Sequence, residues 1–238
     1  MLKGQDAGID GDQCPYVGQG QAQGPWLWNL PTGPTLSCLI LAHGAGAPMD
    51  SLFMSAMAAR LAARGVAVLR FEFAYMARRR EEGGKRPPSP QAQLLTEWRE
   101  LYGQVRQQVT GPLAIGGKSM GGRMASLVAD ELGVDALVCL GYPFHAVGKA
   151  EKPRVAHLAE LQTPTLIVQG ERDALGDRQT VAAYALSAAI RVQWLAAADH
   201  DLKPLKVSGF SHEQHLDSAA DEVSAFLLPR LDGPIVPA

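Results

Sequence analysis

The 238-residue sequence has few of the features that mark secreted, membrane-bound or nucleic-acid-binding proteins. It contains three cysteines, Cys14, Cys38 and Cys139, and their odd number and wide spacing fit neither a disulfide framework nor a zinc site. It has no uninterrupted apolar run of about 18 residues, so we expect no membrane-spanning helix. The net charge is −2, which gives no reason to expect nucleic-acid binding. We therefore expect no membrane, nucleic acid or metal as a partner.

The two ends of the chain differ in composition from the middle. Residues 1–24 are polar and glycine-rich, with aspartates where the apolar core of a signal peptide would lie, so no signal peptide is expected. This segment is predicted to be loosely ordered or an edge hairpin, and residues 229–238 are interpreted as a tail. Because Cys38 and Cys139 lie in apolar runs, a reducing cytoplasm is the expected compartment.

Alternating strand and helix patterns fill residues 25–228. Hydrophobic residues make up 47% of the chain and charged residues 19%, and the length fits one domain. Short, nearly continuous apolar runs indicate strands buried on both faces of a parallel sheet. These runs are 36–42, 66–71, 113–115, 136–140, 165–168 and 192–195, with an outer strand at 25–30. Helical spacing predicts helices at 51–64, 91–109, 120–132, 178–190 and 212–228. We therefore predict an α/β fold, and we interpret the mixed-charge segment 78–88 as a mobile loop.

The most informative motif is Gly-Lys-Ser-Met-Gly at residues 117–121, with Ser119 at its centre. An apolar run precedes it and a helical pattern follows, which is the setting of a nucleophile elbow. The glycines permit a sharp turn that holds the serine in a strained conformation and exposes its hydroxyl. Ser119 is therefore a candidate nucleophile. The alternative is a glycine-rich turn in which the serine only caps the helix.

A catalytic serine needs a base and a group that orients the base. Asp173 follows the apolar run 165–168, and His200 follows the run 192–195. Because the carboxyl ends of parallel strands meet at one edge of a sheet, we expect these side chains to converge there. The order Ser, Asp, His then predicts Ser119 as nucleophile, His200 as base and Asp173 as orienting acid.

Four other residues are alternatives for the base and the acid. His212 and His215 lie at or inside the last helix and are interpreted as surface or helix-start residues. His145 precedes the acid in the chain, which is the wrong order for the base. Glu171 is an alternative acid that lies closer to the strand than Asp173.

A glycine-rich turn, residues 43–46, directly follows the first long apolar run. Its small residues let backbone N–H groups face the site, so we assign the oxyanion hole to the N–H groups of Ala45 and Met120. His43 is expected to shape the turn by hydrogen bonding, and His43 and Gly44 are counted among the residues expected to contact substrate. The ammonium of Lys118 has two interpretations. It pairs with Glu72 or another carboxylate, or it adds positive potential near the oxyanion or a substrate carboxylate.

Residues 25–228 resemble the α/β-hydrolase superfamily. Three motifs are similar to its KANL3/Tex30-type branch, which is close to dienelactone-hydrolase-like proteins. They are His-Gly-Ala-Gly at 43–46, Gly-Gly-Lys-Ser-Met-Gly-Gly-Arg at 116–123 and Asp-His-Asp-Leu-Lys-Pro at 199–204. The resemblance implies a three-layer αβα sandwich with an eight-stranded, mostly parallel sheet, a Ser-Asp-His triad and no cofactor. It implies no particular substrate, and some relatives are parts of larger assemblies.

Lids in this superfamily are usually inserted where residues 141–163 lie, and about two dozen residues are too few for a folded cap domain. We therefore expect a shallow, open site, covered at most by this segment and the 78–88 loop. Five residues are candidates for its rim: Tyr142, Phe144, His145, Met49 and Leu202. Of these, Tyr142 and His145, together with Lys118, are expected to contact substrate.

The sequence therefore predicts a serine hydrolase that cleaves small esters, thioesters or lactones through an acyl-enzyme on Ser119. Its expected partner is a small-molecule acyl substrate. One alternative is a non-catalytic protein-interaction domain that keeps the fold, and another is acyl transfer or perhydrolysis. The complete triad favours an enzyme, because an interaction domain has no physical need for all three side chains.

Overall fold

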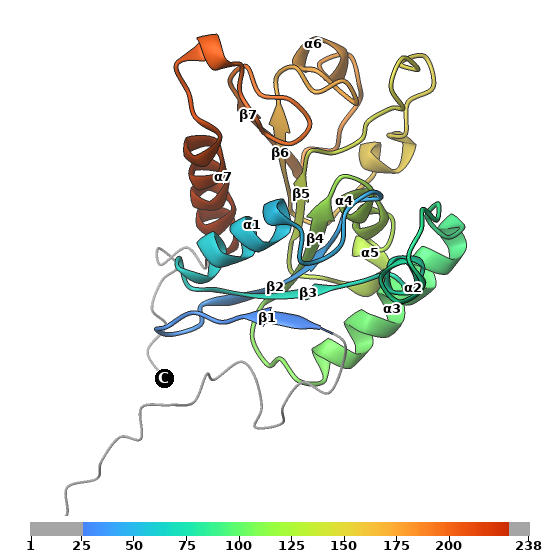
Figure 1. The fold of residues 1–238 in the computed structure, drawn as a ribbon, viewed down its shortest axis with the longest axis vertical. Coiled ribbons are helices and arrows are strands. Elements are labelled where there is room, and N and C mark those ends of the chain that lie inside the picture. Colours follow the sequence, from blue (N-terminus) through green and yellow to red (C-terminus); the bar gives the residue numbers. More distant parts are fainter. Residues whose placement is uncertain (1–25, 229–238) are drawn as a thin grey trace, which may run out of the picture.

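A computed structural model describes residues 26–228, and its centre is a mixed sheet with seven strands in that range (Figure 1). The strands are β1 (Leu27–Asn29), β2 (Ser37–Ala42), β3 (Val66–Phe71), β4 (Leu113–Lys118), β5 (Leu137–Leu140), β6 (Thr165–Gly170) and β7 (Ile190–Leu195). Their order is β1-β3-β2-β4-β5-β6-β7. Among these seven strands of the described chain, only β1 is antiparallel to its neighbour. The described part therefore has one strand fewer than the resemblance implied, and the hairpin considered for residues 1–24 lies outside it.

Helices cover both faces of the sheet, which confirms the three-layer α/β architecture, and no cap domain is present in residues 26–228. They are α1 (Leu52–Ala62), α2 (Ala74–Glu82), α3 (Gln91–Arg106), α4 (Met120–Ser126), α5 (Ala129–Leu132), α6 (Arg178–Val181) and α7 (His212–Leu227). Helices α1 and α7 pack together on one face, and α3 and α4 lie on the other (Figure 1). Within residues 26–228, each helix is too short or too polar to span a bilayer.

The central strands belong to two hydrophobic cores at once. Along β2, Leu39 and Leu41 face the core beneath α1 and α7, whereas Cys38 and Ile40 face the core beneath α3 and α4. This alternation follows from the two-residue period of a strand. It explains why β2 is apolar at successive positions instead of alternating with polar residues.

Two predicted elements in the second half of the chain differ from the structure. The helix predicted at 120–132 is interrupted after Ser126, and α5 begins again at Ala129. The helix predicted at 178–190 is wrong, because α6 ends at Val181 and Ile190 begins β7. The intervening backbone turns instead of continuing a helix: the N–H of Ser187 donates to Leu158 O. Contacts with the rest of the fold therefore override the helix propensity of this alanine-rich stretch.

The mixed-charge segment 78–88 is only partly a loop. Residues 78–82 form the end of α2, and the Arg80 guanidinium binds Asp50 and Glu72. The prediction of a wholly mobile connection is wrong for this half, because the arginine finds carboxylates on neighbouring segments.

Two glycine substitutions test how closely the backbone is packed. A Cβ at Gly116 in β4 would lie 2.2 Å from Val138 O, whereas a Cβ at exposed Gly103 in α3 meets nothing within 4 Å. We expect Gly116→Ala to lower the free energy of unfolding by about 3 kcal/mol or more. Gly103→Ala should raise it by about 0.5–1 kcal/mol. Urea denaturation followed by tryptophan fluorescence measures both, and equal stability of the two variants would contradict this packing.

Candidate functional site

Ser119 lies at the turn between β4 and α4, at the carboxyl edge of the sheet. Its backbone has φ 52° and ψ −117°, a left-handed conformation that costs a non-glycine residue of order 1–3 kcal/mol. Its N–H donates to Leu140 O at 3.0 Å, which ties the turn to the end of β5. The strained turn predicted from the sequence is therefore present at this serine.

Three side chains from three loops meet at this edge. His200 Nε2 lies 2.9 Å from Ser119 Oγ, and His200 Nδ1 lies 2.7 Å from Asp173 Oδ2. With Nδ1–H donating to the carboxylate, Nε2 accepts the serine O–H. The structure therefore brings together the three residues that the sequence predicts, and the arrangement allows the imidazole to take a proton from the serine.

The buried carboxylate of Asp173 is held by contacts that sequence reasoning missed. Gln169 Nε2 donates to Asp173 Oδ2 at 2.9 Å, and the Leu175 N–H donates to Oδ1 at 2.8 Å. The Gln169 amide also accepts from the Tyr142 N–H and donates to Gly176 O. The only sequence signal for this role was a polar residue near the end of an apolar strand.

Lys118 fixes the backbone that carries the histidine. Its Nζ donates to His200 O at 2.7 Å and lies 3.2 Å from Asp201 Oδ1. Burial lowers the pKa of this ammonium, although the Asp201 charge acts in the opposite direction. Of the two interpretations of Lys118, pairing with a carboxylate describes this geometry. The partner is Asp201, because Glu72 binds Arg80 instead.

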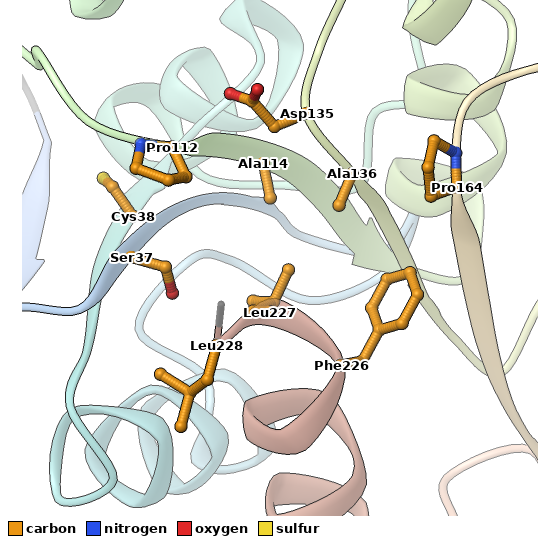
Figure 2. A pocket seen from close by; sticks show the side chains of 10 residues that line it. All are labelled: Ser37, Cys38, Pro112, Ala114, Asp135, Ala136, Pro164, Phe226, Leu227 and Leu228. Atoms are coloured by element: carbon orange, nitrogen blue, oxygen red, sulfur yellow. The ribbon is translucent and has the colours of Figure 1, made fainter. Parts of the chain in front are cut away.

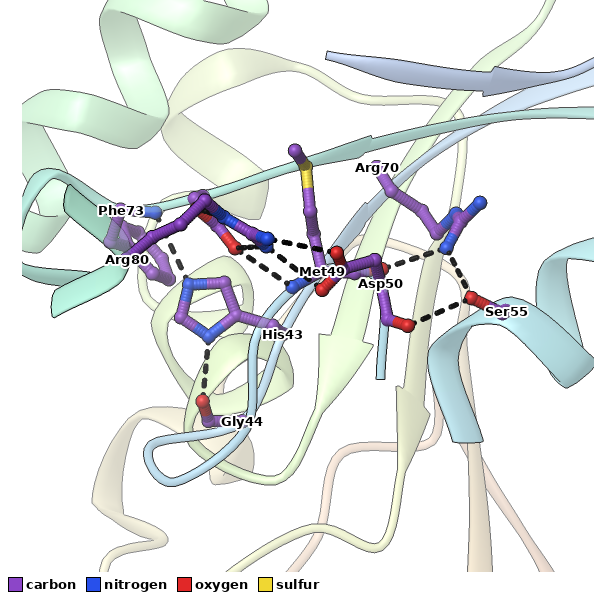
Figure 3. Close-up of polar contacts among 9 residues, drawn as sticks. His43, Gly44, Met49, Asp50, Ser55, Arg70, Phe73 and Arg80 are labelled. Carbon is purple, nitrogen blue, oxygen red and sulfur yellow. Dashed lines mark hydrogen bonds and ion pairs between the residues drawn. The ribbon is translucent and has the colours of Figure 1, made fainter. Parts of the chain in front are cut away.

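The turn at 43–46 lies directly against the serine. A Cβ at Gly44 would lie 3.7 Å from Ser119 Cβ. The buried His43 ring shapes this turn: its Nδ1 lies 2.6 Å from Gly44 O, and the Phe73 N–H donates to its Nε2 at 3.2 Å (Figure 3). Burial lowers the His43 pKa, which favours the neutral imidazole. His43 is fully buried and lines neither cavity beside Ser119, so counting it as a substrate contact is wrong.

Arginine contacts hold the segment that follows this turn (Figure 3). Arg80 binds both carboxylate oxygens of Asp50, at 2.8 and 2.9 Å, and also Glu72, which accepts from the Met49 N–H. Arg70 donates to Met49 O at 2.8 Å. Two arginines from β3 and α2 therefore hold the connection between the turn and α1.

The prediction that Tyr142, Phe144 and Leu202 lie at the rim of the site is wrong, because all three are fully buried. The chain after β5 turns inward at Gly141, whose φ is 65°, and packs its aromatic rings in the core. His145 is also buried, and its ring Nδ1 lies 2.9 Å from Ala146 O. Neither Tyr142 nor His145 lines a cavity beside Ser119, which contradicts their expected contact with substrate.

Tyr142 belongs to a polar cluster beneath the site. Its hydroxyl lies 3.3 Å from both Ser126 Oγ and His157 Nε2, and Ser126 Oγ lies 2.9 Å from the same nitrogen. Burial, together with the smaller effect of the nearby Arg123 charge, lowers the His157 pKa from 6.5 to about 4. His157 is therefore neutral near pH 7.

The alternative bases and acid have other partners. His212 Nε2 lies 3.0 Å from Asp201 O, and His215 Nδ1 lies 3.2 Å from Leu202 O. His215 is buried in the first turn of α7, so of its two interpretations the helix-start one holds and the surface one does not. Glu171 accepts from the Ala197 N–H and pairs with Arg178. None of these side chains contacts Ser119.

Two cavities meet at Ser119 and Ala45. The first, of about 390 Å³, extends over Met120, Arg123, Arg154 and Leu175. The second, of about 250 Å³, is lined by Phe53, Lys118, His200 and Asp201. Met120 begins α4, so its N–H has no acceptor within the helix. The N–H groups of Met120 and Ala45, assigned to the oxyanion hole from the sequence, thus belong to residues that flank the serine.

A third cavity, of about 280 Å³, lies at the opposite edge of the sheet (Figure 2). Its lining comes from the amino ends of β2 and β4, the residues before β5 and β6, and the end of α7. No member of the triad lines it. Among residues 26–228, no group of three or more His, Cys, Asp or Glu side chains is placed to hold a metal ion.

A protein-family model described as an alpha/beta hydrolase domain matches residues 35–228. A comparison with curated proteins found no match.

Solved structures with similar folds include serine hydrolases and esterases. An α/β serine hydrolase without a lid from Xanthomonas campestris is 19% identical, with a TM-score of 0.63, over 86% of this chain and 89% of its own. Est1E from Butyrivibrio proteoclasticus, with ferulic acid bound, is 17% identical, with a TM-score of 0.64. The match covers 84% of this chain and 92% of Est1E. Dienelactone hydrolase from Anabaena variabilis is 20% identical, with a TM-score of 0.57. The match covers 86% of this chain and 92% of that protein. At these identities the likeness concerns the fold.

His157, the partly buried histidine of the polar cluster, makes a pH-dependent contribution to stability. Because the folded-state pKa of His157 is about 4 and its ordinary value is 6.5, the unfolded chain binds more protons between these values. The contribution is therefore complete above pH 6.5 and is lost as the pH falls through 4. We expect His157→Gln, which keeps a polar group without titrating, to lose less stability than the wild type between pH 7 and pH 4. Parallel pH profiles from urea denaturation would contradict this.

Proposed function

Because this chain belongs to the alpha/beta hydrolase domain family, we propose that it is a serine hydrolase that cleaves small carboxylic esters, thioesters or lactones. The observation that carries the proposal is the hydrogen-bonded series from Ser119 through His200 to the buried Asp173. A serine hydroxyl is a weak nucleophile near neutral pH, and a base at 2.9 Å removes that obstacle.

The proposed reaction proceeds through an acyl-enzyme. Ser119 Oγ attacks the carbonyl carbon while His200 Nε2 takes its proton, and the N–H groups of Ala45 and Met120 stabilise the resulting oxyanion. The bond to the leaving group then breaks, and the imidazolium returns the proton to the departing oxygen or sulfur. Water next attacks the acyl-enzyme with His200 as base, and the carboxylic acid leaves.

The buried Asp173 orients the imidazole and stabilises its charged form. Lys118 acts as a positioning residue, since it holds the backbone carbonyl of His200. The absence of a cap domain in residues 26–228 leaves the acyl-enzyme accessible to water, which supports hydrolysis over transfer to another acceptor.

Three motifs support a narrower placement of this chain within the family. From residues 43–46, 116–123 and 199–204, we propose that the chain belongs to the KANL3/Tex30-type branch. We also propose that the protein acts in the cytoplasm and that its partner is a small-molecule acyl compound.

Substitution of the triad tests the proposed reaction. With p-nitrophenyl acetate as substrate, Ser119→Ala and His200→Ala should each lower kcat by several orders of magnitude, and Asp173→Asn by about 10⁴. His212→Gln is the matched control, because His212 is the alternative base nearest in the chain and does not contact Ser119. It should keep wild-type turnover. Equal inactivity of the wild type and Ser119→Ala would favour a non-catalytic interaction domain.

A further inference from the structure

The first cavity beside Ser119 is lined by two arginines and by no acidic residue of the described chain. The two arginines are Arg123 and Arg154. By contrast, Arg99 pairs with Glu131 and Arg178 pairs with Glu171 on the surface. The cavity is therefore positively charged, without a counter-ion from the described part of the chain.

Arg123 lies one helical turn after the nucleophile. Its N–H donates to Ser119 O at 3.0 Å, and both residues line the first cavity, so Arg123 lies near Ser119. Its Nη2 donates to Gln91 Oε1 at 3.2 Å, and its buried Nε has no hydrogen-bond partner. Leaving such a donor unpaired costs of order 1–3 kcal/mol, which an anion in the cavity would offset. Arg123 therefore keeps hydrogen-bonding capacity that its contacts within residues 26–228 do not use.

Arg154 reaches the same cavity from residues 141–163, the segment where relatives insert a lid. Its backbone N–H donates to Phe144 O at 2.6 Å, and its side chain forms no ion pair within residues 26–228. Burial lowers the pKa of Arg123, and the Arg154 charge acts in the same direction, so the two guanidinium groups lie close enough to repel. A shared anion would turn this repulsion into attraction.

The position of the histidine decides which half of a substrate enters this cavity. His200 must protonate the leaving group, so the leaving group lies on the His200 side of Ser119. His200 lines the second cavity and does not line the first. The first cavity therefore takes the acyl half. Lys118 does not supply the charge for an acyl anion, because it lines the second cavity and is engaged by Asp201 and His200 O.

We propose that the acyl group transferred to Ser119 carries a carboxylate at its far end, which Arg123 and Arg154 bind. The substrate class is the half-ester or half-thioester of a short dicarboxylic acid. This inference rests on the proposed hydrolase function and assigns the substrate of the same site. Hydrolysis of such a half-ester consumes one water and releases the alcohol and the dicarboxylic acid.

A pair of esters that differ in one charged group tests the proposal. Monoethyl glutarate carries the carboxylate, and ethyl glutaramate is a neutral ester of the same length. For the wild type, we expect kcat/KM, measured as ethanol release, to be ten- to a hundredfold higher for the carboxylate. Arg123→Gln and Arg154→Gln should each move this ratio toward one. Arg191→Gln is the matched control, because Arg191 pairs with Glu222 away from the cavity, and it should keep the wild-type ratio.

Calorimetric titration with glutarate, the diacid product, separates failure of this inference from failure of the hydrolase. Equal kcat/KM for the two esters, with turnover that depends on Ser119, would overturn the carboxylate site alone. If neither of these esters nor p-nitrophenyl acetate is hydrolysed, the hydrolase function fails. Glutarate binding that weakens at least tenfold in both arginine variants would then still support the anion site, and its absence in the wild type would overturn it. Because Arg154 is exposed, Arg154→Gln remains a test if Arg123→Gln does not fold.

Discussion

The site depends on a close approach of backbones that only glycine permits. A Cβ at Gly117 would lie 2.6 Å from the Gly121 carbonyl carbon, and one at Gly121 would lie 2.5 Å from His43 O. These contacts are with backbone atoms, so no side-chain rearrangement relieves them. The approach brings the end of β4, the start of α4 and the turn at 43–46 together around Ser119. The left-handed conformation of Ser119 persists because packing on both sides of the turn fixes it.

A second set of contacts keeps the base and the acid in place. Asp173 accepts hydrogen bonds from Gln169 and Leu175, and Lys118 holds the carbonyl of His200. Burying the Lys118 ammonium has a cost, as its lowered pKa indicates, and the exposed carboxylate of Asp201 offsets part of it. Rigid support of this kind matters because proton transfer between serine and histidine needs a hydrogen bond of the right length. The charged groups near the triad thus have two different tasks. Lys118 positions the base, and the two arginines of the first cavity face the acyl half of a substrate.

The elements that could be predicted from the sequence are those with strong local signals. Continuous apolar runs predicted the central strands, and the glycine-rich motif predicted the nucleophile elbow. Both predictions depend on steric constraints among residues close together in the sequence. The positions of Asp173 and His200 could be predicted because the carboxyl ends of parallel strands lie at the same edge of the sheet. Longer-range packing could not be predicted. Tyr142 is buried because the chain turns inward after Gly141, and the alanine-rich segment after Val181 leaves the helix to contact Leu158. Likewise, Arg123 has no ion pair within residues 26–228, and this depends on which carboxylates the fold brings near it.

The contacts around Ser119 should make this one serine nucleophilic, and covalent labelling measures that property. The wild-type protein would be treated with a fluorophosphonate probe, and the adduct located by mass spectrometry of the intact protein and its peptides. We expect a single adduct on Ser119, formed much more slowly in His200→Ala. An unlabelled protein, an adduct on another serine, or equal labelling rates with and without His200 would contradict a nucleophilic Ser119 activated by His200.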